Sequence, residues 1–243
     1  GFGNDIKYQL NDAYIGLEYK FRIGKWTNKP ALYSHWYALK TEQASGNRVI
    51  EKQVWLPQWT SEFEFNKSET LNFNYKLEVG FPEVSQLADQ CTLQNYNLVF
   101  KGNALLENEQ FHSANLRYSK MNMYRGITWN AMASFLKKEK TIRNEVILQG
   151  INQVNSPFLR DNPETNYNVN GTFTKKIYRF NLRLNTRLSW FNYLQTLNGV
   201  TTSNDRNNQK VGFLIKTAYK KWPTVSVGYT KGFSQFKGIT QSN

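Results

Sequence analysis

The sequence predicts an all-β protein, an antiparallel transmembrane β-barrel, from three observations. Residues 13–23, 70–79 and 178–190 alternate apolar and polar side chains with a period of two, which puts one kind on each face of a strand. These stretches are long for strands and carry aromatic residues near their ends. Aromatic residues make up 15% of the chain, although its mean hydropathy is -0.64. Transmembrane barrels combine these properties, because the lumen is polar while the lipid face and its interfacial girdles are apolar and aromatic.

The alternation is sharpest over residues 178–190, and it assigns side chains to the two faces of the barrel wall. The even positions supply the lipid-facing candidates, which are Phe180, Leu182, Leu184 and Leu188. The odd positions supply the lumen-facing candidates, which are Arg179, Arg183 and Arg187. Asn181 and Asn185 share the odd face, so we expect this face of the strand to line water.

The chain is predicted to form one barrel segment, residues 1–243, of about ten to twelve strands. The expected strands span 4–11, 12–25, 29–40, 50–65, 69–80, 110–120, 123–137, 141–153, 165–176, 177–193, 207–221 and 224–236. Tight turns are expected at 122–125 and 220–224. Segments 42–48 and 198–208 are rich in Ser, Thr, Asn, Asp and Gly and are predicted to be long exposed loops.

One irregular excursion, near residues 81–109, interrupts the alternation and includes one expected helical turn within 83–89. Irregular backbone is not tolerated against lipid, because its polar groups would lack hydrogen-bond partners there. We therefore expect this excursion to lie outside the hydrocarbon layer or to fold into the lumen.

Several other classes of protein fit the sequence poorly. No stretch approaches the roughly 18 consecutive apolar residues of a spanning helix, which excludes a bundle of membrane helices. The chain shows neither an initiating Met nor a secretory leader, so we expect a mature protein or a fragment. Its single cysteine, Cys91, rules out an intrachain disulfide and is expected to be a small buried hydrophobe.

The net charge of +13 raises the question of nucleic-acid binding. A nucleic-acid surface is expected to combine a patch of Lys and Arg with stacking aromatic rings on the same face. In residues 178–190 the arginines and the aromatic rings take opposite faces. We therefore expect no nucleic-acid partner, and instead a basic lumen or contact with anionic lipid headgroups.

Catalytic and metal-binding constellations are not evident in the sequence. Two serines neighbour histidines, as Ser34-His35 and His112-Ser113, but adjacent residues of a strand point to opposite faces and cannot pair as nucleophile and base. One Cys and two separated His give no metal-site spacing, and Gly102 lacks the further glycines of a nucleotide-binding loop. The prediction is a protein without enzymatic activity, metal or cofactor.

The seven tryptophans lie mostly near the ends of the expected strands. Such positions are typical of the interfacial girdle of a membrane barrel. In an alternative interpretation, Trp55 and Trp59, which flank Pro57, stack on sugar rings or other ligands in an extracellular loop.

The stretch from Tyr75 to Lys120 carries a motif within the irregular excursion. Its members are Gly102, Asn103, Leu106 and Glu109, which form the string Gly-Asn-x-x-Leu-x-x-Glu between two amphipathic segments. This pattern resembles the Gly-Asn-Pro-x-Leu-x-Pro-Glu motif in the barrels of TonB-dependent outer-membrane receptors. Ala104 and Asn108 stand where the family has its two prolines. The strands that follow, up to Gly238, are also similar to that family's barrel.

The resemblance implies uptake of a ligand across the outer membrane of a Gram-negative cell. Family members have barrels of about 22 strands, so this chain would be an incomplete portion of a larger barrel, without the family's plug domain. The implied partners are outer-membrane lipid including lipopolysaccharide, a TonB-type energy-coupling complex acting through a plug, and, in some branches of the family, a surface lipoprotein. The ligand itself is not encoded in any motif.

Two alternatives stay open from the sequence. The chain could be a complete small outer-membrane barrel without a plug, serving as an adhesin or a structural protein. It could also be a soluble secreted β-sandwich that binds carbohydrate. A sandwich would have shorter strands and a buried face richer in Val and Ile than in Tyr and Phe.

Overall fold

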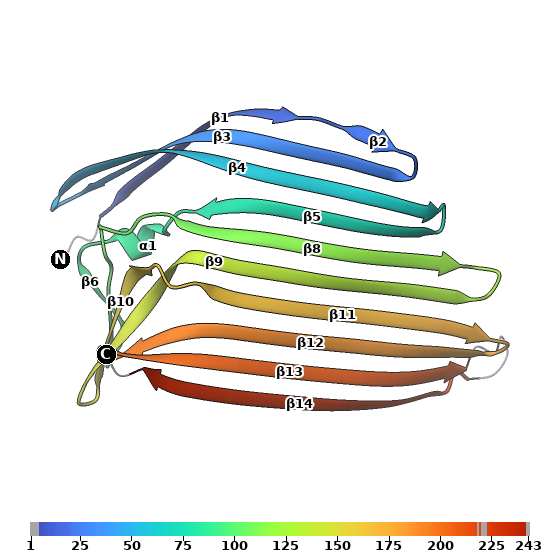
Figure 1. The fold of residues 1–243 in the computed structure, drawn as a ribbon. Helices are drawn as coiled ribbons and strands as arrows, with labels where there is room; N and C mark the ends of the chain where they lie inside the picture. The colour runs from blue at the N-terminus through green and yellow to red at the C-terminus, as the bar shows by residue number, and fades with distance from the viewer. Residues whose placement is uncertain (1–4, 218, 220–222, 242–243) are drawn as a thin grey trace.

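A computed structural model describes the chain except for residues 1–4, 218, 220–222 and 242–243. The described residues form one fourteen-stranded sheet and a single helix of four residues (Figure 1). The elements are β1 (Lys7–Glu18), β2 (Phe21–Ile23), β3 (Trp26–Gln43), β4 (Gly46–Asn66), β5 (Glu69–Gly80), α1 (Val84–Leu87), β6 (Cys91–Asn95), β7 (Leu98–Lys101), β8 (Glu109–Asn122), β9 (Ile127–Gln149), β10 (Asn152–Arg160), β11 (Glu164–Ile177), β12 (Phe180–Leu197), β13 (Val200–Thr217) and β14 (Ser226–Gln241). No described helix has the length and apolar character needed to span a bilayer.

Ten long strands carry the architecture, in the order β1-β3-β4-β5-β8-β9-β11-β12-β13-β14, and each neighbouring pair is antiparallel. The short strands β2, β6, β7 and β10 attach beside this path. The all-β antiparallel prediction is therefore confirmed, and its count of ten to twelve strands matches the main path.

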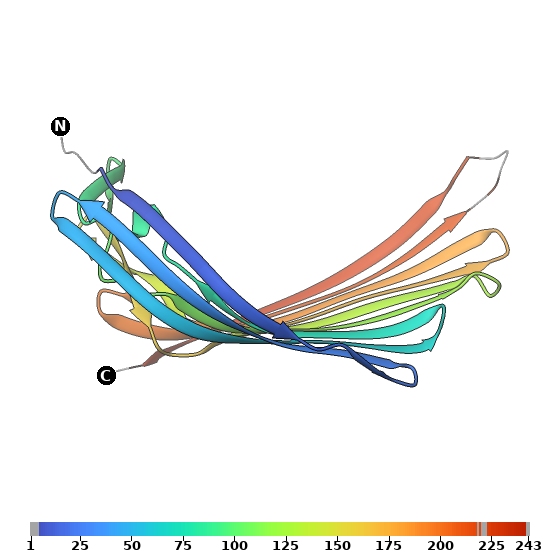
Figure 2. The same ribbon diagram turned by 90° about the horizontal axis from the view of Figure 1, so that it is seen from above.

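The sheet bends into an open trough with a strong twist (Figure 2). Its path ends at β1 on one side and at β14 on the other, and within the described part of the chain no pairing joins these two strands. All fourteen strands belong to this sheet, so the described residues contain no second sheet to form a sandwich. A ring closed within these residues, as a complete small barrel requires, is not formed either.

Several expected boundaries are wrong, and cross-strand pairing is the reason. The segments 123–137 and 141–153 merge into the single strand β9. The expected loop 198–208 is mostly strand, because β12 pairs with β13 as far as Leu197 and Val200. Only Asn198 and Gly199 connect the two strands, and both have the positive φ angles, 48° and 78°, of a tight hairpin turn.

The remaining expected strands, loops and turns are confirmed only in part. The segments 4–11 and 12–25 give one strand, β1, with the short β2 after it. The expected loop 42–48 shrinks to two residues between β3 and β4, while the tight turn near 122–125 is confirmed. The other expected turn, 220–224, falls largely outside the described residues.

The excursion over residues 81–109 folds back onto the polar face of the sheet, where α1 lies within the bend (Figure 2). Its core joins Leu87 of α1 and Leu106 to Leu39 of β3, and each of these side chains is at most 2% exposed. The expected helical turn within 83–89 is confirmed by α1. The long connection therefore covers part of one face of the sheet.

Cys91 is exposed, which corrects the expectation of a buried thiol. It begins β6, a five-residue strand in which every residue is exposed. β6 pairs only with β7 in the described structure, so no layer covers Cys91. The expectation came from the usual burial of free cysteines, whereas this position is set by a short peripheral hairpin.

Candidate functional site

The sheet separates its side chains into an apolar face and a polar face, and the registers show that each face continues from strand to strand. One row on the apolar face crosses five neighbouring strands; its members are Trp129, Phe173, Leu184, Phe213 and Tyr229. All five side chains are at least 36% exposed on the described chain. On the other face, the row that joins Asn170, Arg187, Lys210 and Gly232 carries no apolar side chain.

The lipid-facing candidates of the sequence lie on the apolar face. Leu184 is 42% exposed and lies between Phe173 of β11 and Phe213 of β13. Phe180 at the start of β12 is exposed to the same extent, and Leu182 and Leu188 are half-buried. The four residues share one parity of β12, so one surface receives all of them.

Aromatic rings pack against one another along this surface. Trp129 meets Tyr118 edge-on at a centroid distance of 5.5 Å and Phe173 at 6.3 Å. Farther along the same strands, Phe135 packs on Tyr167 at 4.9 Å. The rings thus form two groups on this face, separated by small and aliphatic side chains of β9 and β11.

The six tryptophans of the described structure all share the apolar face, and two of them satisfy polar groups there. Trp59 donates its indole N–H to Asn28 Oδ1 at 3.3 Å, and Trp26 donates to Ser61 Oγ at 2.5 Å. Asn28 is only 2% exposed, because the tryptophan rings cover this part of β3. Trp55 and Trp59 belong to β4, so the extracellular loop assumed for sugar stacking is not where they lie. Trp222 falls outside the described residues.

The lumen-facing candidates divide between a strand and a turn. Arg183 and Arg187 lie on the polar face of β12, and both are exposed. Arg179 precedes β12, in the turn after β11, and its guanidinium lies over the rings of Tyr178 at 5.1 Å and Tyr219 at 5.0 Å. The turn places Arg179 beside these two rings at the end of the strands, and it does not join Arg183 and Arg187 on the strand.

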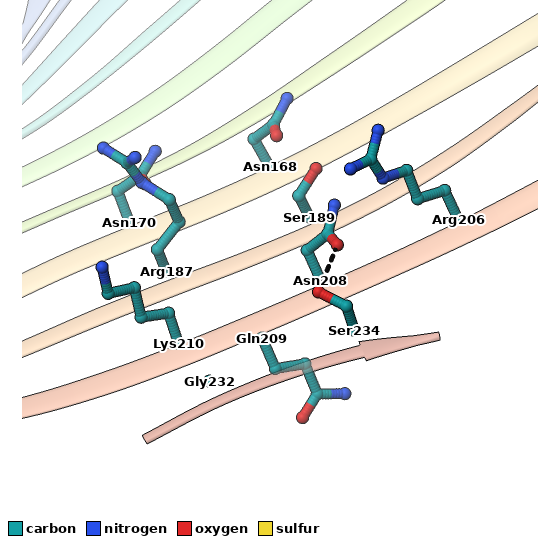
Figure 3. A pocket seen from close by; sticks show the side chains of 10 residues that line it. All are labelled: Asn168, Asn170, Arg187, Ser189, Arg206, Asn208, Gln209, Lys210, Gly232 and Ser234. Carbon is teal, nitrogen blue, oxygen red and sulfur yellow. Dashed lines mark hydrogen bonds between the residues drawn. The ribbon is translucent and has the colours of Figure 1, made fainter. Parts of the chain in front are cut away.

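A hollow of about 520 Å³ opens on the polar face over β11 to β14 (Figure 3). Ten residues line it, which are Asn168, Asn170, Arg187, Ser189, Arg206, Asn208, Gln209, Lys210, Gly232 and Ser234. Figure 3 shows Arg187, Arg206 and Lys210 extending to the same side of the sheet, whereas Gln209 extends to the other side. Every side chain on this wall is polar.

Neighbouring strands hold the polar side chains of the hollow in place. Arg187 of β12 lies directly opposite Lys210 of β13, and it donates from Nε to Asn170 Oδ1 of β11 at 3.1 Å. On the other side, Ser234 of β14 donates its hydroxyl to Asn208 Oδ1 at 2.8 Å. Gly232 lies opposite Lys210, and the absence of a side chain there leaves the hollow open beside the lysine.

Carboxylates are missing from the lining of this hollow, and the surrounding sequence is also poor in them. Residues 165–243 contain twelve Lys and Arg but a single acidic residue, Asp205. Asp205 has the opposite parity on β13 and accepts a hydrogen bond from Asn192 at 2.6 Å. Salt bridges in the described structure are confined to residues 7–164. The cations of the hollow therefore have no acidic partner among the described residues.

The Gly-Asn-x-x-Leu-x-x-Glu string in the excursion has a structural basis, which begins with Gly102 and Asn103. A Cβ atom on Gly102 would lie 2.1 Å from the carbonyl oxygen of Ala88, so only glycine fits there. Asn103 donates from its backbone N–H to Gln86 O at 2.7 Å and from Nδ2 to Pro157 O at 3.2 Å. These two residues tie the excursion to the end of α1 and to β10.

Leu106 and Glu109 complete the attachment of the excursion. Leu106 is 1% exposed within the core cluster. Glu109 Oε1 accepts hydrogen bonds from Thr141 Oγ1 at 3.0 Å and from the backbone N–H of Ile142 at 2.7 Å. The four motif residues thus join the excursion to the sheet, and none of them lines the hollow over β11 to β14.

The two serine and histidine neighbours make separate contacts. His35 Nδ1 pairs with the carboxylate of Asp12 at 2.9 Å, whereas Ser34 accepts a hydrogen bond from Gln53 on the other face. His112 Nδ1 bonds the hydroxyl of Tyr75 at 2.7 Å. Within the described part of the chain, no group of three or more His, Cys, Asp or Glu side chains is arranged to hold a metal ion. Cations, amides and hydroxyls line the polar hollow, so this hollow is suited to binding through hydrogen bonds and positive charge.

Sequence reasoning missed Arg206 and Lys210. Arg206 fell in an expected loop, and Lys210 was not assigned to a site, although both extend the alternation of β13. The scarcity of acidic residues after Glu164 was the signal that could have found them. A block that contains cations without partners indicates a surface that meets negative charge.

Comparisons with known proteins found similarity only at the level of solved structures. The siderophore receptor PirA from Pseudomonas aeruginosa aligns with 93% of this chain at 10% sequence identity and a TM-score of 0.46. A mutant of the ferric enterobactin receptor PfeA from Pseudomonas aeruginosa, in complex with enterobactin, aligns with 92% at 9% identity and a TM-score of 0.43. This chain spans 57% and 48% of those two proteins. No family model and no curated protein matches the sequence.

Proposed function

We propose that this chain is part of the wall of an outer-membrane β-barrel receptor or transporter, which takes up a ligand across the outer membrane of a Gram-negative cell. The observation that carries the proposal is the exposed apolar face of a single curved sheet whose other face is polar. An uncovered apolar surface of this extent is unfavourable in water, because its contact with water costs about 25 cal/mol per Å². Lipid on one side and water on the other satisfy both faces.

The dimensions of the apolar face agree with a bilayer. From Phe180 to Trp190 the strand β12 rises by about 33 Å, at about 3.3 Å per residue. A tilt of about 40° reduces this to roughly 25 Å along the membrane normal, which is the height of the apolar band of outer-membrane barrels. One group of packed rings lies at an end of this stretch, because Tyr167 is opposite Trp190, and an interfacial aromatic girdle is found at that height.

The connections support an orientation in the membrane. The two long connections, 81–108 and 150–163, leave one end of the sheet, whereas the described turns at the other end are short (Figure 1). Outer-membrane barrels have short periplasmic turns and longer extracellular loops. In this proposal the end with α1 and β10 faces the cell exterior.

The proposed partners follow from the same function. Outer-membrane lipid, including lipopolysaccharide, would contact the apolar face and its aromatic girdles. The Gly102 motif supports a TonB-dependent mechanism, in which a plug domain couples the barrel to an energy-transducing complex. A surface lipoprotein would assist ligand capture in some receptors of this kind. Passage of the ligand needs no covalent chemistry, so the proposal includes no enzymatic activity and no cofactor.

Two neighbouring positions of β12 test the membrane assignment. Leu188→Cys and Ser189→Cys, each in a Cys91→Ser background, place a nitroxide label on opposite faces of one strand. In full-length protein purified from membranes and reconstituted in vesicles, the label at 188 should be reached by dissolved oxygen and the label at 189 by a water-soluble nickel chelate. Equal access of the nickel chelate to both labels would refute the lipid face. A heat-modifiability gel on the same protein checks that a barrel has formed.

A further inference from the structure

We propose that the hollow over β11 to β14 binds a hydroxyl-bearing anionic ligand, with short acidic oligosaccharides as the representative class. The inference rests on the proposed function, because a ligand in transit reaches this face only if it lines the lumen. It goes further by assigning residues to ligand recognition. Arg187, Arg206 and Lys210 supply the positive charge, and the amides and hydroxyls between them supply neutral hydrogen bonds.

The charge of the hollow has no internal counterpart. Arg187 and Lys210 are directly opposed, and like charges in that position destabilise a sheet. No carboxylate lines the hollow, and Asp205, the only acidic residue in 165–243, has the opposite parity on β13. An anionic ligand would relieve this repulsion and gain charge-assisted hydrogen bonds to the two guanidinium groups.

The layout of the donors indicates an extended ligand with neutral polar groups between its charges. Arg206 and Lys210 are four residues apart on β13, which separates their backbones by about 13 Å. Asn208 lies between them on the same face, with Ser189 and Ser234 opposite it on the neighbouring strands. Amide and hydroxyl groups in this middle part are suited to sugar hydroxyls. A volume of about 520 Å³ accommodates a small ligand.

Two features keep the hollow accessible and preformed. Arg187 is held by Asn170, so its guanidinium is oriented before any ligand arrives. Gly232 presents no side chain, and a Cβ atom added there would find its nearest neighbour 3.9 Å away. The strand backbone therefore leaves room beside Lys210.

Isothermal titration of the full-length protein in detergent tests this site with tetragalacturonic acid, an acidic oligosaccharide, and with maltotetraose, a neutral one. Tetragalacturonic acid should bind with an affinity that falls as salt is raised, and maltotetraose should not bind measurably. Arg187→Gln, Arg206→Gln and Lys210→Gln should each weaken binding by about tenfold. Gly232→Thr should also weaken it, through bulk alone and without a change of charge.

Two charge-matched variants serve as controls. Arg183→Gln lies on the same face of β12 but outside the lining, and Lys231→Gln lies on the apolar face of β14. Both should bind tetragalacturonic acid within about threefold of the unmodified protein. An equal loss in Lys231→Gln, or binding of maltotetraose as tight as that of the acid, would overturn the proposed site.

The spin-label and gel measurements separate this inference from the proposed function. A protein that passes both but binds no acidic oligosaccharide is a barrel without this ligand site. A protein that fails both but binds the acid through Arg187 and Arg206 retains the site and loses the membrane assignment. Each result therefore contradicts one of the two proposals and leaves the other standing.

Discussion

Arg187 on β12 lies directly opposite Lys210 on β13, so two cations face each other across one pair of strands. Their repulsion makes a charge reversal informative. Lys210→Glu should form a cross-strand pair with Arg187 and raise the free energy of unfolding by about 0.2–1 kcal/mol. Urea titration of the protein in vesicles measures the change. Lys210→Gln is the control, because it removes the repulsion without adding attraction and should fall between the two. A loss of stability in Lys210→Glu would contradict this arrangement.

The assignment of the two faces of β12 predicts opposite sensitivities at adjacent residues. Leu184→Arg would place a charge on the apolar face among Phe173 and Phe213, at a cost of about 2–4 kcal/mol if it lies near the bilayer midplane. Arg183→Leu, one residue away on the polar face, should cost much less. Folding equilibria in lipid vesicles give both values, and the reverse order would show that the faces are exchanged.

Gly102 predicts a steric effect confined to the excursion. Gly102→Ala places Cβ 2.1 Å from the carbonyl oxygen of Ala88, so the segment must shift, at about 1–3 kcal/mol. The visible result should be faster proteolytic cleavage within residues 81–108, with the rest of the sheet intact. Gly171→Ala on β11 is the matched control, because an added Cβ meets no atom within 4 Å. Equal protease resistance of the two variants would refute the close contact.

Glu109 predicts a cost for losing one acceptor. Glu109→Ala leaves the hydroxyl of Thr141 and the backbone N–H of Ile142 without this partner, and Thr141 is only 1% exposed. The expected loss of stability is about 1–3 kcal/mol. Glu107→Ala is the comparison, because Glu107 is half-exposed and its one ion pair among the described residues is with Lys52, at 3.3 Å. Chemical denaturation of both variants should give the larger loss at Glu109, and equal losses would contradict its role.

The long strands were predictable because a sheet with two different environments imposes a period of two on its residues. This holds for β12 between Phe180 and Trp190, where each face keeps one character. The period fades beyond Trp190, where β12 carries apolar residues on both faces and the paired start of β13 carries polar residues on both faces. There, pairing between strands maintains the structure, and local composition predicts a loop instead.

The candidate site was predictable only in part, because it depends on contacts between strands. Arg183 and Arg187 were nominated by parity, but their neighbours across the sheet depend on the register with β13. Arg179 was predicted to lie on the strand, whereas Tyr178, with φ of 51°, begins the turn after β11 and places Arg179 in that turn. Similarly, the parallel pairing of β7 with β10 joins segments about fifty residues apart, and no local sequence pattern predicts this pairing.

The short turns on either side of β12 bear on the order of folding. The turn at Tyr178 and Arg179 joins β11 to β12, and that at Asn198 and Gly199 joins β12 to β13, so these three strands pair with their immediate neighbours in the sequence. Contacts of low sequence separation form fastest, since little loop entropy is lost. The strands β11 to β13 should therefore pair early, before β7 pairs with β10 across about fifty residues of chain. The charged face of these strands would then be formed before the more distant strands of the sheet have paired.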